Sequence, residues 1–153
     1  MYKMQGRLEQ ALLIERDVYS GYVRLEGELA INTLMEASNL ATLLLDVKRH
    51  EEARSLLRKT LHVARRVLGE NHADTLRLRW NYADALYNDP GATLDDLREA
   101  VTTLEDAERI ARRVLGGTYP MTTGIAQDLR AARAALRARE TLPPAGDLAE
   151  EVD

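Results

Sequence analysis

The stretch that decides the fold is ARRVLG, which occurs at residues 64–69 and again at residues 111–116. A shift of 47 residues superposes the two copies. A shift of 42 residues, applied further upstream, matches Asn39 with Asn81 and several apolar neighbours. Self-similarity at a period of this size is the sequence signature of a repeat array. Because the two shifts differ, we expect an insertion of about five residues, which the turn-rich segment 88–91 accommodates.

Apolar residues recur at the helical period along most of the chain. The pattern predicts two antiparallel hairpins built from helices at about residues 31–46, 50–67, 73–87 and 93–115. Two flanking segments, residues 5–19 and 119–139, align with a second helix and a first helix of such a hairpin. We therefore expect an all-α fold of antiparallel helical hairpins stacked as a short superhelix: half a repeat, two full repeats and half a repeat.

Small and large apolar residues fall at matching places in the two repeats. Small residues, which allow helices to approach closely, are expected at Ala41, Ala53, Ala83 and Ala100. Large residues that fill the space between helices are expected at Leu40, Leu44, Leu57, Leu86 and Leu104. Gly69 and Gly116 stand where helices should end, because glycine adopts the left-handed C-terminal conformation without steric cost. Asp74-Thr75 and Thr93 are the expected N-terminal caps.

Composition and charge exclude several classes of protein. The chain of 153 residues contains no Cys, which excludes a disulfide framework and thiolate metal sites. The first residues carry charges every few positions, so they fit neither a signal peptide nor a membrane span, and a cytoplasmic location is expected. The formal charge is -4, but five acidic residues and no basic one follow Arg139, so residues 1–139 carry +1. A nearly neutral body argues against nucleic acid and membrane as partners.

The segment after the last helix differs in composition from the rest. Pro143-Pro144-Ala145-Gly146 ends the helical pattern, and the acidic remainder lacks apolar periodicity. We therefore expect a repeat domain at residues 1–141 and a flexible acidic tail at residues 142–153.

The segment RRVLGENHADTL at residues 65–76, followed by NYADAL at 81–86, resembles the tetratricopeptide repeat of kinesin light chains. NLATLL at 39–44 and RHEEA at 49–53 fit the same pattern. The resemblance extends over about residues 5–139. It implies a non-enzymatic protein-binding scaffold in which the first helix of each hairpin lines the inner, concave wall. It also implies that the Asn of the pattern, here Asn39 and Asn81, contacts the backbone of a bound peptide.

Spacing alone places a polar stripe on each of these first helices. Arg77, Asn81, Asp84 and Asn88 fall on one helix face, and the equivalent stripe one repeat earlier consists of Met35, Asn39, Thr42 and Asp46. A stripe that recurs at the repeat period suits a groove built by stacking, although a solvated helix face is the alternative. The candidate peptide-binding residues are Met35, Asn39, Thr42, Arg77, Asn81 and Asp84.

We assign structural roles to the other aromatic, histidine and arginine residues that stand out in the sequence. Trp80 and Tyr87 lie beside the stripe, where they either present aromatic surface to a partner or pack between hairpins; packing is the preferred interpretation. Tyr82 is expected in the core. The three histidines have no zinc-site spacing, and His72 is expected to help cap a helix. A basic face on the last helix, formed by Arg130, Arg133 and Arg137, is interpreted as a solubilising cap.

These observations lead to two functional hypotheses. The first is a protein interaction module, without catalytic residues, cofactor or metal, that binds a peptide or a partner helix in its concave groove. The alternative is a structural unit that forms a homo-oligomer through its unpaired end helices, because the N-terminal helix should expose apolar residues such as Leu8, Ala11 and Leu12. An enzyme is the third choice, since neither a nucleophile elbow nor a phosphate-binding glycine loop is present.

Overall fold

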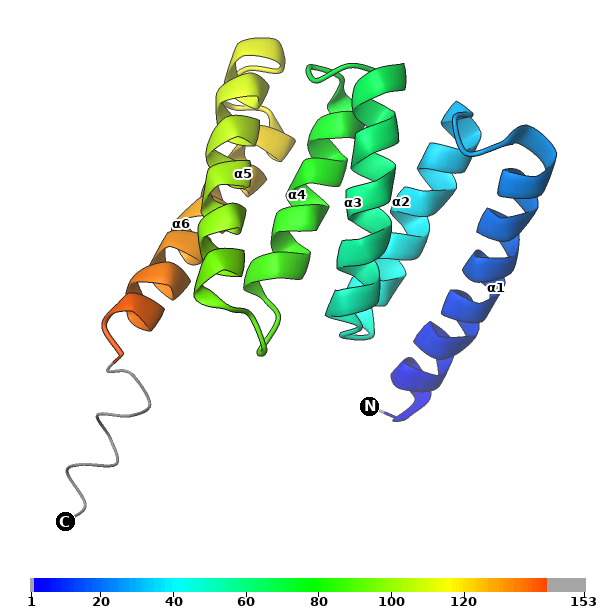
Figure 1. The fold of residues 1–153 in the computed structure, drawn as a ribbon, viewed down its shortest axis with the longest axis horizontal. Helices are drawn as coiled ribbons and strands as arrows, with labels where there is room; N and C mark the ends of the chain where they lie inside the picture. Colours follow the sequence, from blue (N-terminus) through cyan, green and yellow to red (C-terminus); the bar gives the residue numbers. More distant parts are fainter. Residues whose placement is uncertain (1, 143–153) are drawn as a thin grey trace.

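The computed structural model describes residues 2–142, and within them the chain forms helices and no strand. Figure 1 shows the helices side by side in chain order, each antiparallel to the next. Their bounds are α1 Tyr2–Glu26, α2 Ile31–Asp46, α3 His50–Val67, α4 Ala73–Tyr87, α5 Leu94–Val114 and α6 Pro120–Glu140. The predicted all-α hairpin fold is confirmed. Apart from Leu142, the predicted acidic tail lies outside the described residues, so the domain boundary stays a prediction.

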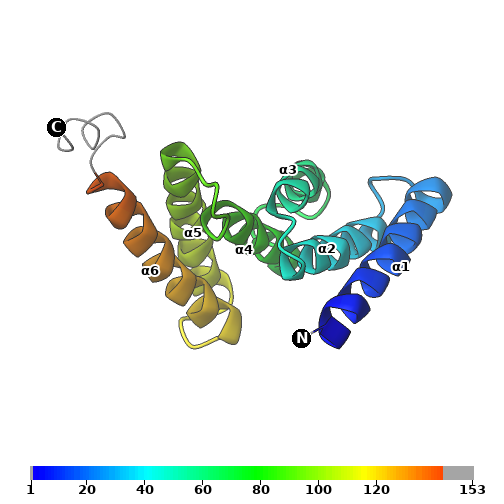
Figure 2. The ribbon, with the colours of Figure 1, turned by 90° about the horizontal axis from the view of Figure 1, so that it is seen from below.

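The helices form two layers. Each helix packs against its neighbours in the chain, and in addition α4 packs against both α2 and α6. The backbones of α1, α3 and α5 do not come into contact with one another. Because helices on one side lie closer together than those on the other, the array curves with α2, α4 and α6 on its inner side. We call these the inner helices and α1, α3 and α5 the outer helices. Figure 2 shows α3 lying on one side of α2 and α4.

The core includes the predicted small and large residues. The four alanines expected at close helix contacts are fully buried, as are Leu57, Leu86 and Leu104. Removing a leucine side chain from water stabilises the fold by about 1.5–3 kcal/mol. Tyr82 is buried as predicted, and its hydroxyl accepts a hydrogen bond from Arg58 Nη2 at 3.0 Å while it donates to Glu99 Oε1 at 2.7 Å. This polar chain links α3, α4 and α5.

Helix ends follow local chemistry. Gly69 and Gly116 have φ of +93° and +94°, as their positions predicted. Thr93 caps α5 in a reciprocal arrangement with Asp96. The expectation that Asp74-Thr75 caps α4 is wrong, because both residues lie inside the helix and Thr75 is buried there. Instead, His72 Nδ1 accepts from the Asp74 amide at 3.0 Å, which confirms the capping role expected for His72.

The first helix is longer than predicted. Self-alignment ended it near residue 19, whereas α1 continues through Ser20 and Gly21 to Glu26. The helix ends before Gly27, whose φ is +89°, and not near residue 19 as expected. The additional residues extend the helix because a single glycine costs only about 1 kcal/mol in a helix interior.

The exposed apolar face of α1 also differs from the prediction. Leu12 is only 1% exposed, because it packs into the core, and Leu8 and Ala11 are half-buried. The exposed large apolar residues are instead Met4, Leu13, Ile14, Val18 and Leu25. The helix does present apolar surface, but its rotation about its own axis was predicted wrongly.

Candidate binding surfaces

The six residues predicted to bind a peptide lie on the inner helices. Asn39, Thr42 and Arg77 are exposed, whereas Met35, Asn81 and Asp84 are partly buried. Three come from α2 and three from α4, at matching positions 42 residues apart. We call this set the inner-wall stripe: Met35, Asn39, Thr42, Arg77, Asn81 and Asp84. None of the six is among the fully buried residues of α2 and α4.

The two asparagines of the stripe are nearly free of internal hydrogen bonds. Asn39 Nδ2 lies 3.5 Å from Glu36 Oε2, a long contact on its own helix. Within the described residues, the Asn81 side chain has no hydrogen-bond partner. Thr42 donates to the Ser38 carbonyl, and Asp84 accepts from the side chain of Asn88. Both asparagine amides therefore retain donors and acceptors for a ligand.

One edge of the stripe is closed by aromatic packing between α4 and α6. Trp80 is half-buried, and its Nε1 donates to Asp128 Oδ2 at 2.5 Å. The indole lies directly over Gly124, where a Cβ would be 2.6 Å from the ring. Burial first, and then the charge of Asp128, raise the pKa of Tyr87. The interpretation of Trp80 and Tyr87 as residues packed between hairpins is confirmed.

The opposite edge of the stripe carries a pair of carboxyl groups between α1 and α2. Burial, the hydrogen bond with Glu36 and the negative charge of Glu36 together raise the pKa of Glu15 to about 7. Its Oε1 is buried without a hydrogen-bond donor among the described residues. Near neutral pH, Glu15 is therefore present partly as the neutral acid, the form that hydrogen-bonds to a neighbouring carboxylate.

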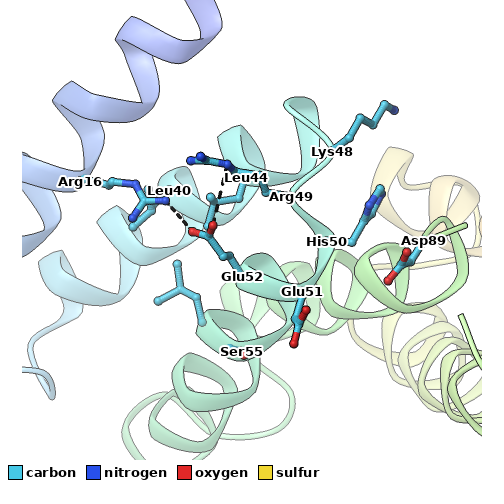
Figure 3. Close-up of a pocket in the computed structure, with 11 residues that line it drawn as sticks. Arg16, Leu40, Leu44, Lys48, Arg49, His50, Glu51, Glu52, Ser55 and Asp89 are labelled. Carbon is cyan, nitrogen blue, oxygen red and sulfur yellow. Dashed lines mark hydrogen bonds and ion pairs between the residues drawn. The ribbon is translucent and has the colours of Figure 1, made fainter. Parts of the chain in front are cut away.

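A hollow opens between the outer helices α1 and α3. It has a volume of about 730 Å³, and the side chains of Leu40 and Leu44 from α2 are among the residues that line it (Figure 3). Arg16 Nη2 spans it from α1 to Glu52 Oε2 at 2.5 Å. Sequence reasoning missed this hollow because it results from the divergence of α1 from α3. The charged run at residues 48–52 was its only sequence signal.

In residues 2–142, His, Asp and Glu side chains form no group of three that could hold a metal ion. No helix there is both long and apolar enough to cross a bilayer. His50 is buried, and His72 serves as a cap. Arg130, Arg133 and Arg137 are exposed on α6, as the interpretation of a solubilising face requires.

Comparison with known proteins supports the repeat assignment. The family model of the tetratricopeptide repeat matches residues 30–89, a span that contains α2, α3 and α4. A search of curated proteins gave no match. Repeats of this family mediate protein–protein interactions and are typically non-enzymatic. Residues 30–89 therefore match the tetratricopeptide repeat, within a chain that folds as an all-α array of antiparallel helical hairpins.

Proposed function

We propose that the protein is an interaction module of the kinesin light chain repeat type that binds an extended peptide or a partner helix along its inner wall. The observation that carries this proposal is the unused hydrogen-bonding capacity of the Asn39 and Asn81 side chains. They occupy equivalent places on neighbouring inner helices, and their amides are almost unused by the fold. An amide can donate and accept at once, which matches the alternating groups of a peptide backbone.

Charge favours a basic partner. Glu36, Asp46 and Asp84 flank the two asparagines, whereas Arg77 is the basic residue of the stripe. Arg77 Nη1 lies 3.9 Å from Asp74 Oδ1 on the same helix. An acidic wall attracts Lys and Arg side chains and raises the rate of encounter, and this attraction weakens with added salt. We therefore expect binding of a basic segment with an affinity that falls as ionic strength rises.

Site-specific photo-crosslinking tests the proposal. A photoreactive amino acid at Thr42 places the probe on the inner wall, and one at Thr102, an exposed residue of the outer helix α5, is the matched control. In extracts of the source cell, we expect a discrete adduct from position 42 that an excess of unlabelled protein abolishes. Equal adducts from both positions, or adducts from position 102 alone, would contradict inner-wall binding.

A second candidate function is self-association through α1. Ile14 is 64% exposed and Leu25 is 87% exposed on this helix, which is costly for surface that stays in water. A second copy of the chain would cover the face by the same contacts on both sides. Light scattering should then give a dimer mass that Ile14→Asp halves. Val114→Asp, at another exposed apolar position on α5, should leave that mass unchanged. A monomer mass for the wild-type protein would exclude this candidate.

A further inference from the structure

Arg79 is the one arginine of α4 that the fold buries. Its side chain is only 7% exposed, and it points away from the inner wall toward α3 and α5. Nη1 lies 3.5 Å from Glu70 Oε2, and Nη2 lies 3.6 Å from Asp106 Oδ2. Both distances exceed those of good charge-assisted hydrogen bonds. Nε is buried and has no acceptor among the described residues. A buried guanidinium with unused donors is costly unless a ligand satisfies it.

Three further arginines surround the same place. Arg65 Nε lies 3.1 Å from Glu70 Oε1, and Arg109 Nη2 lies 3.0 Å from Asp106 Oδ1. Each carboxylate is thus shared by two arginines. Arg113 has no carboxylate partner among the described residues, and its Nη2 donates to Asn71 Oδ1 at 3.2 Å. Four arginines and two acids leave a surplus of two positive charges around one hollow.

Solvent access and electrostatics agree with this arrangement. The hollow has a volume of about 410 Å³, and it lies between α3 and α5 on the outer side of the array. Burial, followed by the charge of Arg65, lowers the pKa of Arg79. The positive charges of these arginines therefore repel one another. An anion placed among them would reduce that repulsion.

The repeat itself does not require this arginine. One repeat earlier, Ala37 occupies the position of Arg79, and it is fully packed. Glu28 and Lys59 stand at the positions of Glu70 and Asp106 and form an ordinary ion pair at 2.6 Å. The hollow at that junction is about 10 Å³. The wide, arginine-lined hollow is thus peculiar to the junction of α3, α4 and α5.

We propose that this hollow, which we call the arginine hollow, binds a phosphate monoester, with Arg79 at its floor and Arg65, Arg109 and Arg113 at its rim. A phosphate monoester carries close to two negative charges at neutral pH and presents three acceptor oxygens. Arginine donates from a planar fork that suits such oxygens. The surplus of two positive charges matches the charge of this group, and Arg79 Nε is an unpaired donor that one of its oxygens can accept from. The site lies on the opposite face from the inner-wall stripe and does not depend on the proposed peptide binding.

The test measures phosphate binding to the intact chain by calorimetry and by thermal shift, against sodium chloride at matched ionic strength. We expect inorganic phosphate to raise the melting temperature more than chloride does. Arg113→Ala should weaken phosphate binding about tenfold, the loss expected for one charge-assisted hydrogen bond. Arg66→Ala, which removes the equivalent charge one repeat earlier and outside the hollow, should leave the affinity unchanged.

Arg79→Ala distinguishes ligand binding from a purely structural role. Because Ala37 packs well at the equivalent position, this variant should fold, and phosphate should no longer raise its melting temperature. A phosphoserine peptide that binds more tightly than inorganic phosphate would assign the group to a protein partner. Equal affinities would assign it to a small phosphorylated molecule. The proposal is overturned if phosphate acts no differently from chloride, or if Arg66→Ala weakens binding as much as Arg113→Ala does.

Discussion

Replacement of Gly124 by alanine tests the contact that joins the last helix to the array. In an ordinary helix interior this change stabilises by up to about 1 kcal/mol, because alanine is the better helix former. Here the new Cβ would lie 2.6 Å from one ring carbon of Trp80 and 2.7 Å from another. The indole must move, and this movement breaks its hydrogen bond to Asp128. Such overpacking costs about 1–3 kcal/mol.

The cost therefore exceeds the gain in helix propensity, and we expect Gly124→Ala to lower the free energy of unfolding by about 1 kcal/mol. Gly21→Ala is the matched control, since Gly21 also lies inside a helix but has no atom within 4 Å of its added Cβ. It should stabilise the protein. Urea denaturation followed by circular dichroism measures both. Trp80 is the single tryptophan of the chain, so its fluorescence should also shift to longer wavelength in Gly124→Ala alone.

A double-mutant cycle with Trp80→Leu completes the test. Once the indole is removed, Gly124→Ala should become neutral or stabilising, and the coupling between the two sites should be about 1 kcal/mol or more. If Gly124→Ala stabilises the wild-type protein as much as Gly21→Ala does, the packing of α6 on Trp80 described above is wrong.

Three further predictions concern stability. Ala53→Leu should lower the free energy of unfolding by about 1–3 kcal/mol, because Ala53 is fully buried between helices; an unchanged urea midpoint would disprove that contact. The raised pKa of Glu15 means that the folded state binds its proton more tightly than the unfolded state. Stability from this group is present at low pH and is lost as pH rises from about 4.5 to about 7. The full shift corresponds to about 3 kcal/mol, and partial exposure reduces the expected loss to about 1 kcal/mol. Urea titrations at several pH values should show this loss in the wild type and not in Glu15→Gln, whereas the exposed Glu9→Gln should behave like wild type. Thr93→Ala should cost about 1 kcal/mol by the same assay, because it removes the cap of α5; no change would show that Asp96 alone is sufficient.

Helix bounds could be predicted where residues that end helices interrupt the apolar period. The helices at 31–46, 50–67 and 73–87 have the predicted bounds, because Gly69 and the turn before His72 interrupt the apolar period between repeats. The first helix was predicted too short because alignment to a repeat transfers the repeat's length. The local signal for the true end of α1 is Gly27, which lies beyond the segment that the alignment covers.

The candidate site could be predicted only in part. Periodicity placed Asn39 and Asn81 on one wall, because their spacing fixes the helix face on which they lie. Periodicity could not identify the partners of Trp80, because Asp128 and Gly124 come from a different hairpin. Asp128 departs from the Asn of the repeat pattern, because it aligns with Asn81 at a shift of 47 residues. Its contact with the indole explains that departure physically.

Arg79 shows why burial of a charge is the hardest feature to predict. Its position in the helical period belongs to the core, where Ala37 stands one repeat earlier. Sequence spacing cannot say which carboxylates reach a buried guanidinium, because Glu70 lies in a loop and Asp106 on the next helix. The contrast between the two aligned residues was nevertheless visible, and an arginine aligned with a buried alanine is a useful signal for a site of this kind.

Binding by the inner wall is tested most directly by replacing Asn39 and Asn81 together with alanine. The affinity for the crosslinked partner and the melting temperature are measured on the same variant. Loss of both amides should weaken binding by about 1–3 kcal/mol per site, at least tenfold in all, with little change in melting temperature. The matched control is Ser55→Ala with Thr102→Ala, two exposed residues at equivalent places on the outer helices, which should leave the affinity unchanged. Full affinity together with a lowered melting temperature would show that the asparagines support the fold and that the partner binds elsewhere.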